Sequence, residues 1–575
     1  MKCVCLLAFK NINKHKFDTT DMKKIILPVL LTFFTTLAYS QKIEKKGKAI
    51  SNNQPKLVIG IVVDQMRADY VYRFADKFGE GGFNRLLSQG FECSNTNYNY
   101  VPTYTGPGHA AIYSGTVPYY NGIIANDWYE RKVGHKVYVT EDTTVKTIGS
   151  NSDAGKMSPR RLLSTTITDE LQLFNNKQSK VIGICLKDRG SILPAGHFPH
   201  SAYWFDNKTG NWITSSYYTN ELPTWVNRFN DKKLAEQYLS KPWNTLYPIA
   251  QYTVGLANGS PFRLPYKGEE SNQFPHDLPK IMNKEGYELL RSTPFGNSFT
   301  TDFAIETIAQ EKLGKGNFTD FLALSFSSTD YIGHQFGINA IETEDTYARL
   351  DKDLERFFRF VDSSIGIENV LIFLTADHGA AQTPSQMQSL NIPAGIFKSH
   401  KIKDSLSKFI SKQYGEANWV LHYDNQQFWL NNSLLENKKL DRNKLIEICL
   451  NYLKKMEGVQ DVFNTADLLN SNTTAGLVDH LIRGISPLRS GDILMTLQPG
   501  WFDAHYAANG GTTHGSGHVY DTHVPLYWFG WHIKQGASSS PVFITDIAAT
   551  LSDLLHIARP NACIGNPLTE MLIKK

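Results

Sequence analysis

Cysteine is scarce in this chain. The 575-residue sequence contains six, and the four beyond residue 40 stand far apart, at Cys93, Cys185, Cys449 and Cys563. No CxxC pair occurs, which excludes the thiolate zinc sites and redox motifs that depend on this spacing. An exported chain could pair some of these four cysteines, but their spacing selects no pairing.

Long hydrophobic runs are missing as well. The N-terminal apolar run, residues 25–37, is shorter than the about 20 residues of a membrane-spanning helix. Lys23 and Lys24 precede this run and a small-residue site, Ala38 to Ser40, follows it, which predicts a signal peptide over residues 22–40. Residues 1–21 are then an upstream extension from a mis-chosen start codon, or part of a longer leader. No cysteine follows the apolar run, so we expect no lipid anchor and no stable membrane anchor.

An excess of one charge sign is also missing. The formal charge of +4 comes from residues 1–40, and the remaining chain has 53 basic and 53 acidic residues. A balanced chain gives no electrostatic reason to expect a nucleic acid or membrane partner. We expect an exported protein, periplasmic or secreted, whose oligomeric state the sequence leaves open. With 20% charged and 41% hydrophobic residues, the composition excludes coiled-coil, collagen-like and disordered classes.

Short apolar runs that end abruptly in polar residues alternate with helical patterns along most of the chain. The runs are residues 57–63, 181–186, 321–326, 370–375 and 524–529. Apolar residues between 347 and 361, and a pattern near 546–555, recur at helical spacing. This alternation predicts an α/β fold, with a doubly wound, mostly parallel sheet sandwiched by helices.

Two segments break the alternation and are predicted to be insertions. Residues 196–300 are rich in Tyr, Trp, Asn and Pro with little helical period, which indicates an irregular segment. Residues 391–500 have helical patterns at 403–413 and 442–456 and strand patterns at 425–430 and 491–497, as in a small α+β unit. The catalytic core would then consist of residues 41–195, 301–390 and 501–575.

Polar side chains follow the predicted strands where each strand ends. In open α/β sheets, ligands bind outside the carboxyl ends of the strands. A single Asp at such a position is usually a turn or cap residue, but six polar residues at one edge favour a ligand site. These residues are Asp64, Lys187, Arg189, Asp330, Asp377 and His378.

Carboxylates and imidazoles among these residues suit a metal centre. Asp330 and His334 stand one helical turn apart, and His514 lies in a glycine-flanked loop. Ligands of these two types without thiolate suit zinc, with manganese or another borderline metal possible. Six ligands are too many for one catalytic zinc and fit two ions about 4 Å apart, the arrangement suited to in-line displacement at phosphorus. The six are Asp64, Asp330, His334, Asp377, His378 and His514.

A nucleophile candidate lies in the segment Thr105-Gly-Pro-Gly-His109. Pro107 suits a first helical turn, so Thr105 is predicted at a helix N-terminus, where free N–H groups favour an anion. A threonine hydroxyl needs activation by a metal to act as a nucleophile. Thr105 could also be a simple N-cap, and Thr103 is a competing nucleophile in the same segment.

Together these motifs resemble the alkaline phosphatase superfamily. The strand-Asp, Thr-Gly-Pro-Gly-His, Asp-x-x-x-His, Ala-Asp-His-Gly and late His-Gly segments occur in an order similar to that of the secreted, phosphate-irrepressible alkaline phosphatases that use threonine. Nucleotide pyrophosphatase/phosphodiesterases are relatives by motif. The resemblance covers residues 55–568, with weak support inside the two predicted insertions.

The resemblance implies two Zn²⁺ ions per chain. Asp64, Asp377 and His378 would hold the zinc that activates Thr105, which is itself a ligand. Asp330, His334 and His514 would hold the zinc at the leaving oxygen. His518, four residues on, offers a second imidazole and leaves the last ligand open between two histidines, with His523 a less favoured third.

The resemblance also implies phosphate-binding residues. Asn126 would donate to a phosphoryl oxygen, and Lys187 with Arg189 matches a pair that threonine-type monoesterases use and that the diesterases lack. A diester has one of these oxygens blocked, so the cation pair favours the monoester. The implied reaction is hydrolysis of small-molecule phosphate monoesters through a phosphothreonine at Thr105, with activity rising toward alkaline pH.

Three alternatives compete with this interpretation. A phosphodiesterase or nucleotide pyrophosphatase of the same fold would hydrolyse a diester in preference to a monoester. A sulfatase needs a modified Cys or Ser in a Cys/Ser-x-Pro-x-Arg setting, which this chain lacks. A secreted binding protein that merely retains the fold would be expected to lack a metal ligand, yet every expected type is present.

Overall fold

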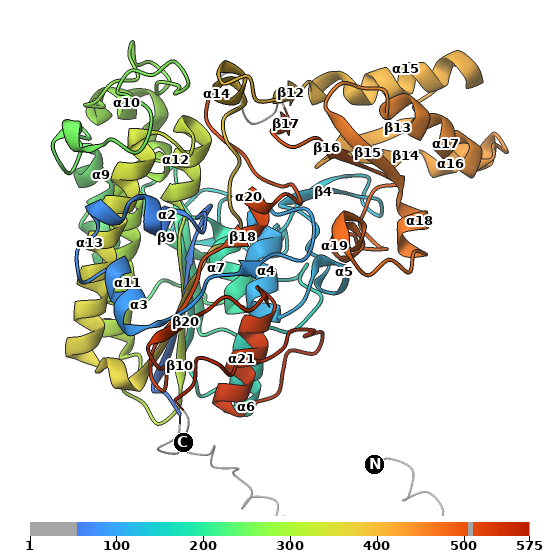
Figure 1. Cartoon of the computed structure of the whole chain (residues 1–575). Coiled ribbons are helices and arrows are strands. Elements are labelled where there is room, and N and C mark those ends of the chain that lie inside the picture. Colours follow the sequence, from blue (N-terminus) through green and yellow to red (C-terminus); the bar gives the residue numbers. More distant parts are fainter. Residues whose placement is uncertain (1–53, 504–509, 574–575) are drawn as a thin grey trace, which may run out of the picture. The chain divides into compact units, whose positions relative to one another are not determined.

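A ten-stranded sheet runs through the part of the chain that the computed structural model describes, residues 54–503 and 510–573 (Figure 1). Its order is β20-β2-β19-β11-β1-β10-β7-β8-β9-β6. The central strands pair in parallel. They are β11 (Val370–Thr375), β1 (Leu57–Val63), β10 (Asp320–Phe326), β7 (Val181–Cys185) and β8 (Ser201–Asp206).

Antiparallel pairing is confined to the two sides of this sheet. On one side β19 (Leu526–Gly530) pairs antiparallel with β11 and with β2 (Phe91–Cys93), and β20 (Gly536–Ser538) adds to β2 in parallel. On the other, β9 (Asn211–Ser215) pairs antiparallel with β8 and with β6 (Thr147–Ile148). The predicted α/β fold with a mostly parallel sheet is confirmed.

The central strands are apolar on both faces. All seven residues of β1 are buried, as are those of β10 and β11, because helices cover both sides of the sheet. Since β1 lies between β10 and β11, which both come later in the chain, the strand order changes direction there. An open crevice forms at such a point, beyond the carboxyl ends of the strands.

Helices form a layer on each face of the sheet (Figure 1). One layer contains α11 (Phe295–Glu311), α12 (Ser328–Phe336) and α13 (Ile341–Ser364). The other contains α4 (Thr105–Ser114), α6 (Ile167–Phe174), α7 (Asp188–Ala195) and α21 (Asp546–Leu555). The helices predicted near 347–361 and 546–555 are confirmed, and α13 buries its apolar stripe, including Leu354 and Phe358.

The prediction that residues 196–300 are irregular is wrong for much of their length. Strands β8 and β9 belong to the central sheet, and α8 (Thr224–Asp231), α9 (Leu234–Leu239), α10 (Leu278–Glu285) and the start of α11 follow. The aromatic residues of β8, such as Tyr203 and Trp204, are buried strand residues, as aromatic side chains commonly are. The predicted strand 524–529 divides at Pro525, which lacks an N–H, into β18 (His523–Val524) and β19.

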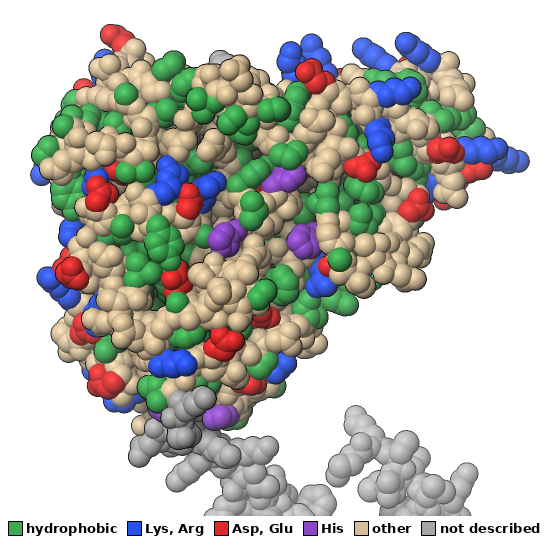
Figure 2. All heavy atoms as spheres, in the orientation of Figure 1, with side chains coloured by type: hydrophobic (Ala, Val, Ile, Leu, Met, Phe, Trp, Pro, Cys, Tyr) green, Lys and Arg blue, Asp and Glu red, His purple; other side chains and the backbone are tan. Residues whose placement is uncertain are grey.

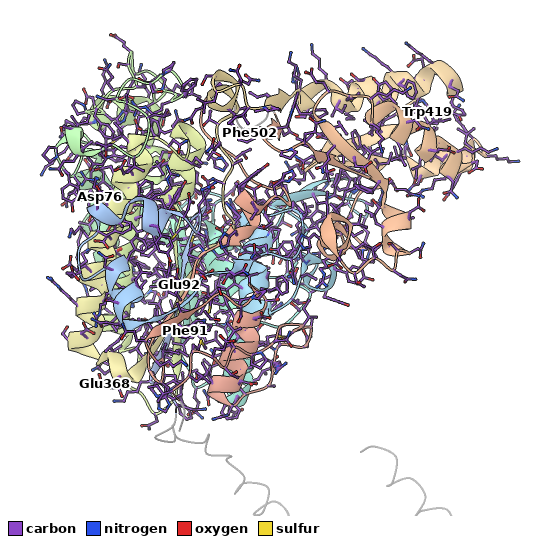
Figure 3. The ribbon with its side chains drawn as sticks, in the orientation of Figure 1. Asp76, Phe91, Glu92, Glu368, Trp419 and Phe502 are labelled. Carbon is purple, nitrogen blue, oxygen red and sulfur yellow. The ribbon has the colours of Figure 1, made fainter. Side chains whose placement is uncertain are left out.

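Residues 391–500 contain their own sheet, ordered β13-β14-β16-β15. Its strands are β13 (Val420–Asp424), β14 (Gln427–Leu430), β16 (Ile493–Leu497) and β15 (Val459–Asn464), and helices α15 (Ile402–Tyr414) and α17 (Arg442–Leu453) pack on it. These elements match the predicted α+β pattern. Trp419, labelled in Figure 3, is buried in the hydrophobic core of this unit.

The cysteine, membrane and charge predictions can be compared with the described residues. The cysteines at 93, 185, 449 and 563 are all unpaired, in β2, β7, α17 and the C-terminal segment. Among the described residues, no helix combines the length and the hydropathy of a membrane crossing. Residues 1–40, with the predicted extension and signal peptide, lie outside the described residues. Figure 2 shows basic and acidic side chains interspersed on the face it displays.

Candidate metal and phosphate site

The polar residues after β1, β10 and β11 gather into two groups of metal-ligating side chains. Asp64, Asp377 and His378 form one group, called here the Asp64 group, and Asp330, His334 and His514 form the Asp330 group. In each group, one ligand atom from every residue lies within 4.8 Å of the others. The structure therefore brings together all six ligands named from the sequence, in the two sets that the resemblance implied.

The three imidazoles are oriented by backbone carbonyls. Each Nδ1 lies 2.7–3.0 Å from a carbonyl oxygen, which can only accept, so Nδ1 carries a proton and Nε2 is the ring nitrogen left to bind a metal. The accepting carbonyls belong to Thr512 for His334, Gly379 for His378 and Thr103 for His514. The Nε2 atoms face carboxylates, 3.1 Å from Asp330 for His334 and 3.4 Å from Asp64 for His378. This is the arrangement of histidine metal ligands.

The carboxylates of the Asp64 group are buried, and the protein does not supply a hydrogen bond for every one of their oxygens. Asp64 Oδ1 and Asp377 Oδ2 are buried with no hydrogen-bond partner among the described residues. Burial raises the pKa of Asp64, and the nearby charge of Asp330 raises it further. Burial likewise raises the pKa of Asp377, and the charge of Asp64 raises it further. Buried carboxylate oxygens without hydrogen-bond partners, beside the Nε2 of a neutral imidazole, fit a divalent cation.

The Asp330 group has a different electrostatic balance. Burial acts to raise the pKa of Asp330, but the charges of His334 and Lys187 hold it well below its ordinary value. Burial lowers the pKa of His514 well below its usual range and that of His378 to about 3, so both rings are neutral and able to ligate. Their rings are stacked, 3.4 Å apart, which joins the two groups.

Lys187 lies between the two groups. Its Nζ is 2.6 Å from Asp64 Oδ2 and 2.6 Å from Asp330 Oδ2, and its side chain is almost fully buried. Burial disfavours the ammonium, but the carboxylates of Asp330 and Asp64 raise its pKa above the ordinary value. The residue named from the sequence as a phosphate contact is therefore a fixed positive charge at the centre of the site.

Thr105 is the first residue of α4, as the sequence predicted. Its Oγ lies 3.5 Å from His378 Nε2, which places the hydroxyl against the Asp64 group. Gly108 explains this approach, because a Cβ there would lie 2.3 Å from the carbonyl oxygen of Asp377. Only a glycine lets the first turn of α4 lie directly on the end of β11.

The competing residues of this segment have other partners. Thr103 Oγ donates to the Ser516 carbonyl oxygen, 2.9 Å away, so its hydroxyl is already engaged. His109 contacts the Thr105 carbonyl through Nδ1 and Ser325 Oγ through Nε2, both at 2.9 Å. Burial lowers the pKa of His109 to about 4. Both ring nitrogens of His109 therefore have partners within the core.

Asn126 contacts the backbone of the same turn. Its Oδ1 accepts from the Gly106 N–H at 2.8 Å, which identifies the other amide atom as the NH₂ donor. A donor fixed in this way beside Thr105 suits an anionic oxygen.

Arg189 lies in the first turn of α7. Its Nη1 donates to the Tyr138 hydroxyl at 2.9 Å, and this hydroxyl donates to Asp188 Oδ1 at 2.9 Å. Asp188 also accepts from the Thr140 hydroxyl, so its carboxylate holds Tyr138 in place. Arg189 Nε is buried without a hydrogen-bond partner among the described residues.

The choice between three late histidines is clear in the structure. His514 belongs to the Asp330 group, whereas His518 Nε2 faces the Leu497 carbonyl at 3.5 Å and His523 Nε2 contacts the Ser94 carbonyl at 2.9 Å. Gln65 is the residue that sequence reasoning missed. Its Nε2 donates to Asp330 Oδ1 at 2.6 Å and its backbone N–H to Asp377 Oδ1 at 3.2 Å. Its position directly after Asp64 at a strand end was the available signal.

Comparison with known proteins agrees with this geometry. The family model for type I phosphodiesterase / nucleotide pyrophosphatase matches residues 58–521. The chain belongs to this family. The match spans β1, both groups and all but the final strands and helix of the central fold.

Several relatives match nearly the full chain. An alkaline phosphatase PhoV from Synechococcus elongatus is 43% identical over 96% of this chain and 99% of its own length. An alkaline phosphatase PafA from Elizabethkingia meningoseptica is 44% identical over 90% of this chain and 95% of its own. A Myroides odoratus protein named calcium-transporting ATPase is 44% identical over 96% of this chain and 100% of its own.

A solved structure supports the fold. The crystal structure of wild-type PafA has a TM-score of 0.88 and 43% identity to this chain, over 91% of this chain and 100% of that one. The resemblance to threonine-type alkaline phosphatases is confirmed by these similarities.

Proposed function

We propose that this chain is an alkaline phosphatase that hydrolyses phosphate monoesters through a phosphothreonine at Thr105. The observation that carries the proposal is the placement of the Thr105 hydroxyl, at a helix N-terminus, against two adjacent groups of buried carboxylate and imidazole ligands. A phosphoryl group needs positive charge around three oxygens and a nucleophile in line with the ester bond. Thr105 would be this nucleophile, and Lys187, Arg189 and bound cations would supply the positive charge.

The residues of the chain divide this work. Thr105 Oγ gives up its proton and forms the bond to phosphorus while the ester bond breaks, and the leaving oxygen departs on the opposite side and takes up a proton. Water then attacks the phosphothreonine, which releases phosphate and restores the Thr105 hydroxyl. The Asn126 amide donates to a phosphoryl oxygen, and its position is fixed by Gly106. Arg189, oriented by Tyr138, and the Lys187 ammonium compensate the charge of the remaining oxygens.

Two Zn²⁺ ions are part of the proposal. The Asp64 group with Thr105 would hold one and the Asp330 group the other, and the unpaired oxygens of Asp64 and Asp377 favour a cation at the first. Bound zinc would supply Lewis-acid stabilisation of the attacking and leaving oxygens and lower the pKa of water. His514, rather than His518, would complete the second set.

We further propose that the chain is exported to the periplasm or secreted, on the evidence of the leader pattern at residues 22–40. Its partners would be small phosphate monoesters, with no nucleic acid partner, since the chain beyond residue 40 is charge-balanced. The similarity to relatives named alkaline phosphatase supports the same activity.

The test compares an aryl phosphate with its methyl ester on zinc-loaded protein. We expect the monoester to be hydrolysed much faster than the diester, because the diester cannot use all the contacts of Lys187 and Arg189. A preference for the diester would instead favour a phosphodiesterase of the same family. Absence of turnover together with less than one zinc per chain would favour a binding protein.

Variants of two neighbouring threonines identify the nucleophile. Thr105→Ala should lose nearly all monoester hydrolysis, and Thr103→Val should retain most of it, because Thr103 Oγ is bonded to Ser516. Acid-quenched wild-type protein should carry phosphate on the peptide that contains Thr105. Full activity of Thr105→Ala would exclude the covalent route.

A further inference from the structure

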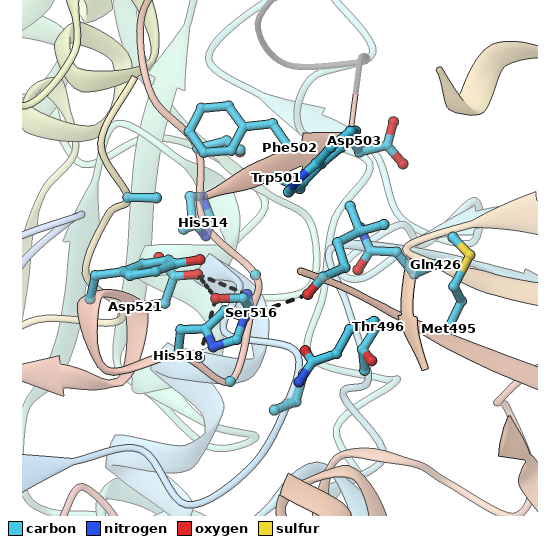
Figure 4. A pocket seen from close by; sticks show the side chains of 18 of the residues that line it. Gln426, Met495, Thr496, Trp501, Phe502, Asp503, His514, Ser516, His518 and Asp521 are labelled. Atoms are coloured by element: carbon cyan, nitrogen blue, oxygen red, sulfur yellow. Dashed lines mark hydrogen bonds between the residues drawn. The ribbon is translucent and has the colours of Figure 1, made fainter. Parts of the chain in front are cut away.

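A cleft opens from the Asp330 group toward the α+β unit. His514 belongs to this group and also lines the cleft, together with residues of the β13–β14 turn, β16 and β17 (Trp501–Asp503). Apart from its open mouth the cleft has an accessible volume of about 60 Å³, below the roughly 300–1,000 Å³ of sites that enclose a whole small molecule, so it can hold only part of a ligand. Figure 4 shows Gln426 and Thr496 on one side and His514, Ser516 and His518 on the other.

Aromatic rings shape this cleft. Trp501 packs against the backbones of Gly395 and Gly458, where a Cβ would lie 2.7 Å and 2.1 Å from the indole, so this ring is held in place. Tyr104, next to Thr105 in sequence, lies 5.6 Å from the His514 ring. Rings that line a narrow cleft favour a planar ligand.

Apart from its histidines, the cleft has no basic side chain among the described residues. No Lys or Arg is among the described residues that line it, whereas Asp503 and Asp521 are. Asp503 accepts from Ser399 and Tyr423, and Asp521 accepts from the Ser516 backbone at 2.8 Å. A carboxylate or second phosphate on the ligand would therefore find no cation here.

We propose that this cleft binds the leaving group of the monoester and selects planar, uncharged leaving groups over anionic ones. The inference rests on the proposed function, in which the Asp330 group lies at the leaving oxygen. The cleft begins at His514 of this group, so the part of the substrate beyond the ester oxygen enters it. Gln426 and Thr496 offer hydrogen bonds to the far edge of such a ring.

The test uses two substrates of the same shape and different charge, 4-carbamoylphenyl phosphate and 4-carboxyphenyl phosphate. The ratio of their kcat/KM values reports how strongly the protein favours a neutral leaving group over a negatively charged one. Gln426→Lys should shift this ratio about tenfold toward the carboxylate and Gln426→Glu should shift it the other way, since opposite charges a few ångströms from the ligand act oppositely. Gln413→Lys, on the exposed side of α15, adds the same charge and should leave the ratio unchanged.

Two outcomes overturn the inference. One is a ratio of kcat/KM values for the two esters that is the same in the wild type and in all three variants. The leaving group would then not reach Gln426. The other concerns binding to chelated protein, measured by calorimetry with 4-hydroxybenzamide and 4-hydroxybenzoate. Equal binding of the two, unaltered by Gln426→Lys, would also refute it. If no monoester is hydrolysed, including methyl phosphate, the proposed function is refuted. The calorimetry still tests whether the cleft binds the planar ligand, because it needs no turnover.

Discussion

At the scale of single residues, the three imidazoles of the site and Asn126 each have one polar atom held by a backbone hydrogen bond and a second polar atom that faces the site. The Nδ1–H of each imidazole in the two groups donates to a carbonyl oxygen, and the Asn126 amide oxygen accepts from the Gly106 N–H. The atom that faces the site, Nε2 of each imidazole or the amide nitrogen of Asn126, is the one available to a ligand. Conservative substitutions should therefore separate a role in binding from a role in packing.

Asn126 allows such a separation. Asn126→Asp keeps an acceptor for the Gly106 N–H but replaces the NH₂ donor with negative charge. We expect kcat/KM for an aryl phosphate to fall by at least about 100-fold, as after loss of a transition-state donor, and the melting temperature to change little. Asn126→Ala should be less impaired than Asn126→Asp, since it adds no repulsion. The reverse order would show that the acceptor contact, not the donor, matters.

The sequence predicted the six ligands because each follows a strand or lies in a short motif. It left His514 and His518 open, because both stand in one glycine-flanked loop and only the fold shows which ring meets Asp330. Gln65 was not predicted, because an amide at a strand end is a weaker sign of a ligand site than a carboxylate or an imidazole. The Tyr138 contact to Arg189 joins residues of β5 (His135–Tyr138) and α7 that only the fold brings together.

At the scale of elements, the approach of α4 to the end of β11 positions the nucleophile. Gly108→Ala adds a methyl group 2.3 Å from the Asp377 carbonyl oxygen, so α4 or β11 must shift. We expect kcat/KM to fall by more than about tenfold, with a stability loss of about 1–3 kcal/mol. Gly316→Ala, at an exposed glycine with open surroundings, is the control and should behave as wild type. Unchanged turnover in Gly108→Ala would mean that this contact does not set the position of Thr105.

The packing of α13 on α11 predicts a pH effect on stability. Burial raises the pKa of Asp353 from 3.8 to about 6, although Arg356 and Ser298 contact it. The folded-state pKa lies above the unfolded value, so the folded protein gains a proton. The carboxyl then stabilises the fold below about pH 4, and this contribution is lost as the pH rises through about 6.

Thermal melts of Asp353→Asn test this effect. Between pH 4 and pH 7 the wild type should lose up to about 3 kcal/mol of stability relative to the variant, which cannot titrate. If the melting temperatures of the two proteins change with pH in the same way across this range, Asp353 keeps an ordinary pKa in the folded state.

The elements of the fold were predictable to different degrees. Strand β1 and helix α13 follow from their apolar patterns. Strands β8 and β9 were missed, because the aromatic content of residues 196–300 was interpreted as an irregular segment, although aromatic residues such as Tyr203 and Trp212 are common in buried strands. The division into core and insertions, with limits near 196–300 and 391–500, stays a proposal apart from this correction.

At the scale of the whole molecule, metal binding and folding should be coupled. Three buried carboxylates meet at the carboxyl ends of the central strands, and Lys187 alone cannot compensate them. Removal of metal by a chelator should therefore lower the melting temperature by several degrees and abolish turnover, and added zinc should restore both. A chelated protein that melts like the untreated one would argue against a cation at this position.

The central claim is that two metal ions lie beside Thr105, and metal analysis of the purified, dialysed protein tests it most directly. We predict two zinc ions per wild-type chain, and close to one in both Asp377→Ala and His514→Ala, since each variant removes a ligand from a different group. Less than one zinc per wild-type chain after loading with zinc, or two zinc ions retained in both variants, would contradict the account.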